Sequence, residues 1–159
     1  MAGPNSAHHI QIKSKHNPII GKAKEELFRR AFSRIDNSIS KGFHLEAITI
    51  TESLICDRLE TLISVVTENR IKAMNLGPLL KIVRQLPEFP PELADEIDDW
   101  RIDRNYVVHQ MVKITTEEVF DWRSRMKFAR ITAIRGQSLV KDVHATTNRI
   151  KRAQKKRRK

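Results

Sequence analysis

The sequence predicts an all-α protein, an antiparallel helical bundle of about five helices. Apolar residues recur at intervals of three and four along most of the chain, which is typical of helices with one buried face. Glycines and prolines divide this pattern into helix-length segments. No stretch of 4 to 8 residues alternates between apolar and polar side chains in the way that predicts a strand. A chain of 159 residues, 40% hydrophobic and 31% charged, suits a single globular domain.

The first two helices are expected to form an antiparallel pair. Apolar residues keep helical spacing from Leu27 to Ile39, so the first helix is predicted over 22–41, with Gly42 as its natural end. A second helix of more than five turns is predicted to begin shortly after Gly42 and to continue to Val66. The short joint between the two requires the chain to reverse direction.

Prolines delimit the next two helices. A shorter third helix is predicted over 78–86, since Pro78 suits a first turn and further prolines follow the helix. A fourth opens at Pro91 or Glu92 and extends to about Lys113, with acidic first turns that suit the helix dipole. Thr115 or Thr116, followed by Glu118, predicts the N-cap of a fifth helix that fades into a basic tail.

Three segments are therefore expected: a flexible arm over 1–21, a helical domain over 22–150 and a basic tail over 151–159. No apolar run is long enough to cross a membrane and no targeting segment is visible, which predicts a cytoplasmic protein. Cys56 is the only cysteine and falls in an apolar pattern, so we expect a core residue and no disulfide. Neither a metal site nor a cofactor is expected.

The net charge of +11 is concentrated at one end of the chain. Residues 1–119 carry a net charge of −1, whereas residues 120–159 carry +12. Such a cluster predicts salt-dependent binding to a polyanion, with a solubilising tail as the alternative. The residues expected to contact nucleic acid are Arg149, Lys151, Arg152, Lys155, Lys156, Arg157, Arg158 and Lys159.

Two charged residues occupy positions where the helical pattern expects apolar ones. Arg104 completes the stripe that runs from Leu93 to Met111, and Glu52 interrupts the run between Ile48 and Ile55. Charges on core-facing stripes indicate either a functional site or an ion pair between the two residues. The positions alone leave both interpretations open.

Arg104 also begins the segment Arg-Asn-Tyr-Val-Val-His, which ends at His109. This segment resembles the R-N-x-x-x-H signature of HEPN domains, all-helical modules found in toxin–antitoxin, abortive-infection and RNA-processing ribonucleases. The resemblance extends to Gly-Phe-His-Leu-Glu-Ala at 42–47, to Asp-Arg-Leu-Glu at 57–60 and to Trp100-Arg101. In helix order it covers roughly residues 22–150.

The resemblance implies a metal-independent endoribonuclease, related to toxins or phage defence, that acts on RNA as a homodimer. The resemblance assigns catalysis to Arg104, Asn105 and His109. It also implies an antitoxin or a regulatory protein as a partner. Glu52, Asp57 and Arg101 are expected to support the site, Asp57 either as a solvated charge or as a partner of Arg58 or Arg104. Many antitoxin-paired members carry a tyrosine where this chain has Met111, so modification of a tyrosine there is not expected.

The residue types suit cleavage by the 2′-hydroxyl of RNA. His109 can exchange a proton near neutral pH, and Arg104 can hold two phosphate oxygens. Asn105 lies one turn before His109 and can orient its ring or the ribose. The products would be a 2′,3′-cyclic phosphate and a 5′-hydroxyl. Arg104 and His109 lie about 140° apart on a helix, so one chain makes a poor site. The resemblance implies an answer, since HEPN proteins typically dimerise with both motifs facing a cleft, which here would be a groove bordered by the basic tails.

Two other functions remain open. The chain could be a non-catalytic HEPN-like module that binds RNA or a protein, or an unrelated helical DNA-binding protein. Tyr106, inside the motif, is expected to serve packing, and His44 and His144 are expected at surface or helix-end positions.

Overall fold

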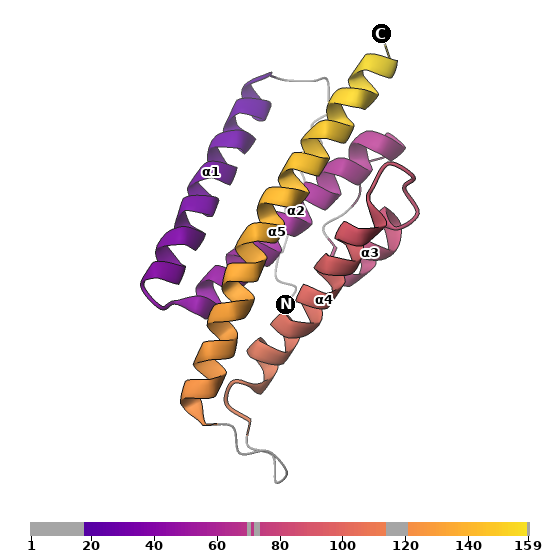
Figure 1. Cartoon of the computed structure of the whole chain (residues 1–159). Helices are drawn as coiled ribbons and strands as arrows, with labels where there is room; N and C mark the ends of the chain where they lie inside the picture. The colour runs from indigo at the N-terminus through magenta and orange to yellow at the C-terminus, as the bar shows by residue number, and fades with distance from the viewer. Residues whose placement is uncertain (1–17, 70, 72–73, 114–120, 159) are drawn as a thin grey trace, which may run out of the picture.

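A computed structural model of the chain describes residues 18–69, 71, 74–113 and 121–158 and confirms an all-helical bundle. Its helices are α1 (Pro18–Ser40), α2 (His44–Thr67), α3 (Leu76–Val83), α4 (Pro91–Gln110) and α5 (Trp122–Arg157). Helices α2 and α5 form the central pair; α1 packs on one side of them and α4 on the other (Figure 1). In the described part of the chain, no helix is both long and apolar enough to cross a membrane.

Gly42 produces the reversal between α1 and α2. Its φ of +79° lies in the left-handed region, which glycine adopts without steric cost. The amide of Phe43 donates to the Ser38 carbonyl at 2.7 Å, and the amide of Gly42 donates to Ile39 at 3.1 Å. This pair of bonds is a Schellman motif, which satisfies carbonyls that the end of a helix leaves open. The predicted end of the first helix and the antiparallel pair are thereby confirmed.

Glu46, in the first turn of α2, fastens this hairpin. One of its carboxylate oxygens accepts from Arg34 Nε at 2.8 Å, and the other accepts from the hydroxyl of Ser38 at 3.0 Å. Both hydrogen bonds hold the pKa of the Glu46 carboxyl below its usual value, and the bond from Arg34 has the larger effect. The bonds join side chains of both helices beside the turn.

The helix ends differ from the predicted ones by a few residues at several points. Helix α1 already begins at Pro18, and α3 begins at Leu76, so Pro78 lies inside its first turn, where its missing N–H costs no bond. Asp121 caps α5 by accepting from the Ser124 amide at 2.6 Å. Thr115 and Thr116, the predicted caps, lie outside the described residues, as do residues 1–17.

Helices α2, α4 and α5 meet in the core at Trp100. The Trp100 side chain is fully buried, and its Nε1 donates to the backbone carbonyl of Thr132 at 2.9 Å. Gly136, one turn further along α5, faces the indole ring; a Cβ there would lie 2.7 Å from Trp100 Nε1 and 2.9 Å from Thr51 Cγ2. Only glycine lets the three helices approach this closely.

The predicted basic tail continues α5 as far as Arg157, so that helix has 36 residues. Arg157 pairs with Glu88 at 3.3 Å. Arg158 pairs with Glu68 at 2.8 Å and donates to the Val65 carbonyl at 3.0 Å. These contacts attach the end of α5 to the end of α2 and to the segment before α4. Lys159 lies outside the described residues.

His144 is packed against the bundle, contrary to the expectation of a surface residue. Its ring stacks on Phe28 with 4.0 Å between centroids, and the Arg58 guanidinium lies 5.0 Å from the same Phe28 ring. Burial lowers the pKa of His144, as do Arg58 and Lys151, although Glu25 acts in the opposite direction. Burial likewise lowers the pKa of His44, which begins α2 as expected.

We predict that the fold loses stability as the pH falls through the ordinary histidine pKa. A histidine whose pKa is lowered by folding binds fewer protons in the folded state than in the unfolded state, so the free energy of unfolding rises with pH. The contribution is complete above about pH 6.5 and declines below it. Thermal unfolding at several pH values should show a smaller decline for His144→Phe, which keeps an aromatic ring against Phe28 but cannot titrate; an unchanged decline would exclude His144 as a source.

Candidate functional site

The motif lies on the second half of α4, where its apolar stripe faces the core. Arg104 takes the predicted place in this stripe, and the confirmed buried members of the stripe are Leu93, Ile97, Trp100, Val107 and Met111. Because the stripe faces α2 and α5, the guanidinium of Arg104 is carried between helices and toward Glu52 of α2.

Arg104 is held by two acceptors. Its Nη2 forms an ion pair with Glu52, and the two side chains are only 22% and 21% exposed. Its Nη1 donates to Asn105 Oδ1 at 2.7 Å. Its buried Nε–H meets no acceptor among the described residues, which is unusual for a buried polar group. The ion pair that the sequence left open is therefore present, and one donor of the arginine is unsatisfied.

Asn105 and His109 lie one turn apart near the C-terminal end of α4. Asn105 is half-buried and its Oδ1 accepts from Arg104, so its NH2 group is the part left to donate outward. His109 is exposed. In the described structure no hydrogen bond joins it to Arg104, in agreement with the rotation of about 140° between the two positions. A single chain thus presents a fixed cation and an exposed imidazole on different faces.

The other two supporting residues have partners of their own. Asp57 accepts from Arg58 Nη2 at 2.7 Å and from its Nε at 3.1 Å, so Arg58 is its partner rather than Arg104. Arg101 donates to Asp98 at 2.8 Å and lines a hollow near Arg84. The structure brings Glu52 to Arg104 but does not bring Asp57 or Arg101 there.

Cys56 lies next to this region, partly buried against the core. Burial, and then the nearby carboxylates of Glu52 and Glu60, raise the pKa of its thiol to about 12. The thiol therefore stays protonated at neutral pH. A thiol in that state is a poor nucleophile.

Exposed apolar side chains surround the exposed face of the motif. They lie on α4, on the turn that follows it and on the first turn of α5, and sequence patterning missed them because single apolar residues outside a stripe carry no periodic signal. Such patches mark interaction surfaces. We call this set the apolar rim: Ile102, Tyr106, Val108, Val112 and Trp122. Tyr106 also packs edge-on against Phe128, with 5.6 Å between centroids, in agreement with its predicted packing role.

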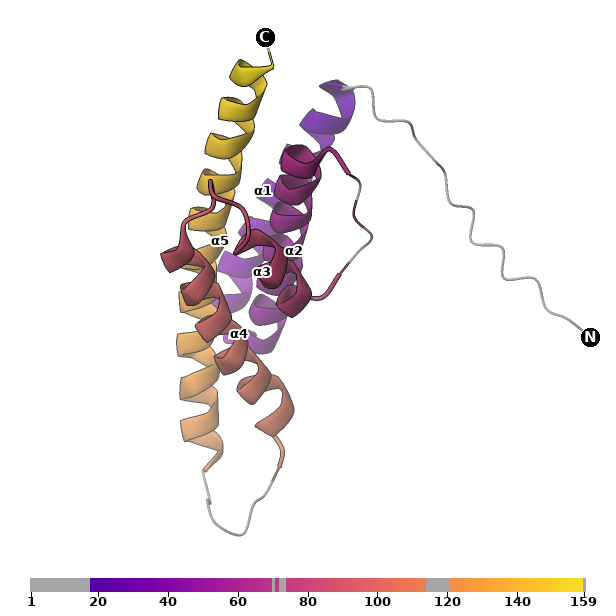
Figure 2. The same ribbon diagram turned by 90° about the vertical axis from the view of Figure 1, so that its right-hand side faces the viewer.

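The basic end of α5 lies far from the motif of the same chain. Arg125 of α5 donates to the backbone carbonyl of Gln110, which places the end of α4 beside the start of α5. Figure 2 shows these two ends together, away from the end marked C. Arg152 lies 27 residues beyond Arg125, a distance of about 40 Å along a helix. The basic cluster from Arg149 to Arg158 therefore cannot border the motif of its own chain, although the sequence predicts a groove that is bordered by basic tails.

Comparison with models of protein families, with curated proteins and with solved structures gives no match to this chain.

Proposed function

We propose that this protein is a metal-independent endoribonuclease of HEPN type that acts as a homodimer. The observation that carries the proposal is the arrangement of Arg104, which Glu52 and Asn105 hold in a fixed orientation one to two turns from an exposed His109. A positioned cation for a phosphate and a titratable ring for proton transfer are the groups that RNA cleavage needs. Loss of cleavage in EDTA on His109→Ala is the direct test.

The reaction uses the substrate's own nucleophile. His109 takes the proton of the 2′-hydroxyl, the 2′-oxygen bonds to phosphorus, and the bond from phosphorus to the 5′-oxygen breaks. The leaving 5′-oxygen takes a proton from the imidazolium of the second chain, which gives a 2′,3′-cyclic phosphate and a 5′-hydroxyl. Arg104 stabilises the charge that develops on the phosphate oxygens, for which its remaining N–H groups are suited.

A dimer supplies what one chain lacks. Burial of the apolar rim against a second copy would bring two motifs together, since the rim lies beside His109 on the same end of the bundle. Mass measurement in solution is expected to give a dimer. Mixing Arg104→Ala chains with His109→Ala chains should restore only part of the cleavage, because a mixed cleft contains one intact arginine and one intact histidine and lacks the second imidazole. A stable monomer would contradict the shared cleft.

A non-catalytic RNA-binding module is the second candidate. It is favoured by the Glu52–Arg104 ion pair itself, because a carboxylate at this position neutralises the cation that a phosphate would need. In that case Arg104 serves only the fold, and its role can be separated from catalysis by substitution.

We predict that Glu52→Ala destabilises the fold by about 1–3 kcal/mol, because it leaves Arg104 half-buried without its partner. The double variant Glu52→Leu/Arg104→Met replaces the pair by apolar groups and should recover most of that loss, as measured by urea unfolding. RNA cleavage should nevertheless remain absent in the double variant. A double variant that is stable and cleaves RNA would show that Arg104 is structural.

A further inference from the structure

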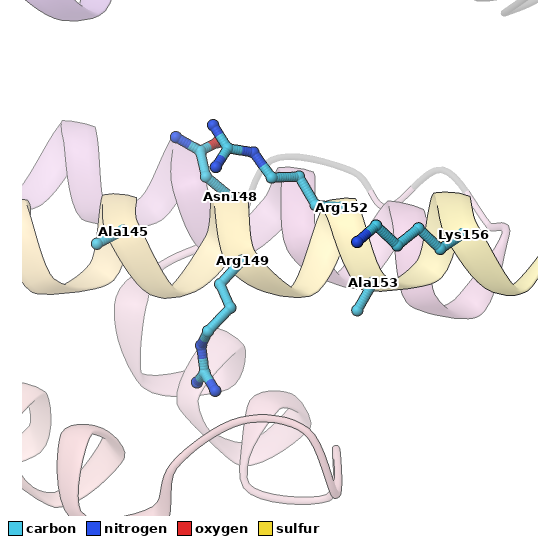
Figure 3. Close-up of a pocket in the computed structure, with 6 residues that line it drawn as sticks. All are labelled: Ala145, Asn148, Arg149, Arg152, Ala153 and Lys156. Carbon is cyan, nitrogen blue, oxygen red and sulfur yellow. The ribbon is translucent and has the colours of Figure 1, made fainter.

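A basic hollow lies on the outer face of α5 near its end (Figure 3). Its volume is about 470 Å³, and its lining consists of Ala145, Asn148, Arg149, Arg152, Ala153 and Lys156. Each of these residues lies three or four positions from another of the set, so together they share one face of the helix. Figure 3 shows Asn148 and Arg152 extending to one side of α5 and Arg149 to the other.

The shape of the hollow follows from the sizes of its side chains. Ala145 and Ala153 end at Cβ and keep the floor close to the helix backbone, whereas the long arginine and lysine side chains form the walls. Asn148 is held in place by its contact with His144 Nε2 at 3.0 Å. The result is a shallow, open site with cationic walls on a rigid helix.

The cations of this end of α5 fall into two groups. Arg157 and Arg158 pair with carboxylates of other elements, and burial followed by repulsion from Arg58 lowers the pKa of Lys151. The others, Arg149, Arg152, Lys155 and Lys156, are exposed and form no ion pair with any carboxylate that the structure describes; all of them except Lys155 line the hollow. The last acidic residue of α5, Asp142, lies three residues before the hollow begins.

The lining fits phosphate groups rather than bases. Guanidinium groups bind two phosphate oxygens at once, and an ammonium adds a point charge. The lining contains no aromatic side chain on which a base could stack. Contacts of this kind hold the backbone of a nucleic acid in place without selecting its sequence.

We propose that Arg149, Arg152 and Lys156 form an anchoring site for the phosphates of an RNA strand, separate from the cleavage motif. The choice of RNA as the ligand rests on the proposed function. Because the hollow lies about 40 Å along α5 from the end of α4, a short oligonucleotide bound at the motif does not reach the anchoring site of the same chain. Affinity should therefore rise with strand length.

The test measures binding of fluorescent single-stranded RNA to full-length His109→Ala protein in EDTA, so that no strand is cut. Strands of about 4 and about 16 nucleotides span the usual range of single-strand sites. Arg149→Gln/Arg152→Gln/Lys156→Gln should weaken binding of the long strand about tenfold at every sequence, and the salt slope should fall by about 2, as expected for three lost phosphate contacts. The short strand should keep its affinity for the motif.

The matched control is Lys41→Gln/Lys81→Gln/Lys127→Gln, which removes the same charge from three exposed and separate places. It should leave the affinity for the long strand nearly unchanged. Equal losses in the two variants would show a general charge effect and would overturn the anchoring site, as would unchanged binding in the first variant or no RNA binding before substitution. Cleavage by the protein with His109 intact is scored separately, so a failed nuclease and a failed anchoring site are distinguishable.

Discussion

Replacing His109 with alanine should lower RNA cleavage in EDTA by about 10²- to 10⁴-fold, the contribution typical of a general acid or base. The imidazole is exposed and makes no contact that supports the core, so folding and RNA affinity should remain near those of the unsubstituted protein. Cleavage is followed with a labelled RNA, and chromatography of the products should show 2′,3′-cyclic phosphate ends.

Gln110→Ala is a suitable control because it removes a neighbouring side chain and keeps the backbone carbonyl that accepts from Arg125. It should cleave RNA at an almost normal rate. If His109→Ala cleaves as fast as this control, His109 is not the catalytic group and the non-catalytic module becomes the better description. Products with 3′-hydroxyl ends would argue against attack by the 2′-hydroxyl.

Trp100→Ala should destabilise the fold by about 3–5 kcal/mol, as measured by urea unfolding. The substitution leaves a cavity between three helices and removes the hydrogen bond to the Thr132 carbonyl. Since small domains are stable by only about 5–15 kcal/mol, this loss should leave a measurable fraction unfolded.

Leu27→Ala is the control, because this large apolar side chain on α1 is 67% exposed and lies outside the apolar rim. Its cost should stay within about 0.5 kcal/mol. Gly136→Ala tests the same contact from the other helix and should cost about 1–3 kcal/mol, because the added methyl group meets the indole ring. Similar losses for Trp100→Ala and Leu27→Ala, or no loss for Gly136→Ala, would contradict the close contact of α4 and α5.

Much of the fold could be predicted because the spacing of apolar residues along each helix also marks the face that packs against other helices. The stripe of α4 was visible as intervals of three and four, and all of its apolar members are buried. The ion pair of Glu52 and Arg104 is one of the two interpretations that the sequence leaves open, since opposite charges on core-facing stripes indicate either a pair or a functional site. Gly42 was identifiable because helices commonly end at a glycine.

The end of α5 and the surroundings of His144 could not be predicted in this way. Lysine and arginine are good helix formers, so a run of them is equally compatible with a helix and with a tail. In the structure the helical end of α5 pairs with Glu68 and Glu88, which are remote from it in the sequence. His144 likewise packs on Phe28, more than a hundred residues away, and no local pattern reports that contact.

The contact between Trp100 and Gly136 also limits how the motif can adapt to a ligand. A bulky ring seated against a glycine fits at one register only, because a shift of α4 along α5 would place a side chain where the glycine now leaves space. Ligand-driven sliding between these helices is therefore disfavoured. Arg104 lies one turn beyond Trp100, so any adjustment to a substrate falls to side-chain rotamers and to the way two chains meet.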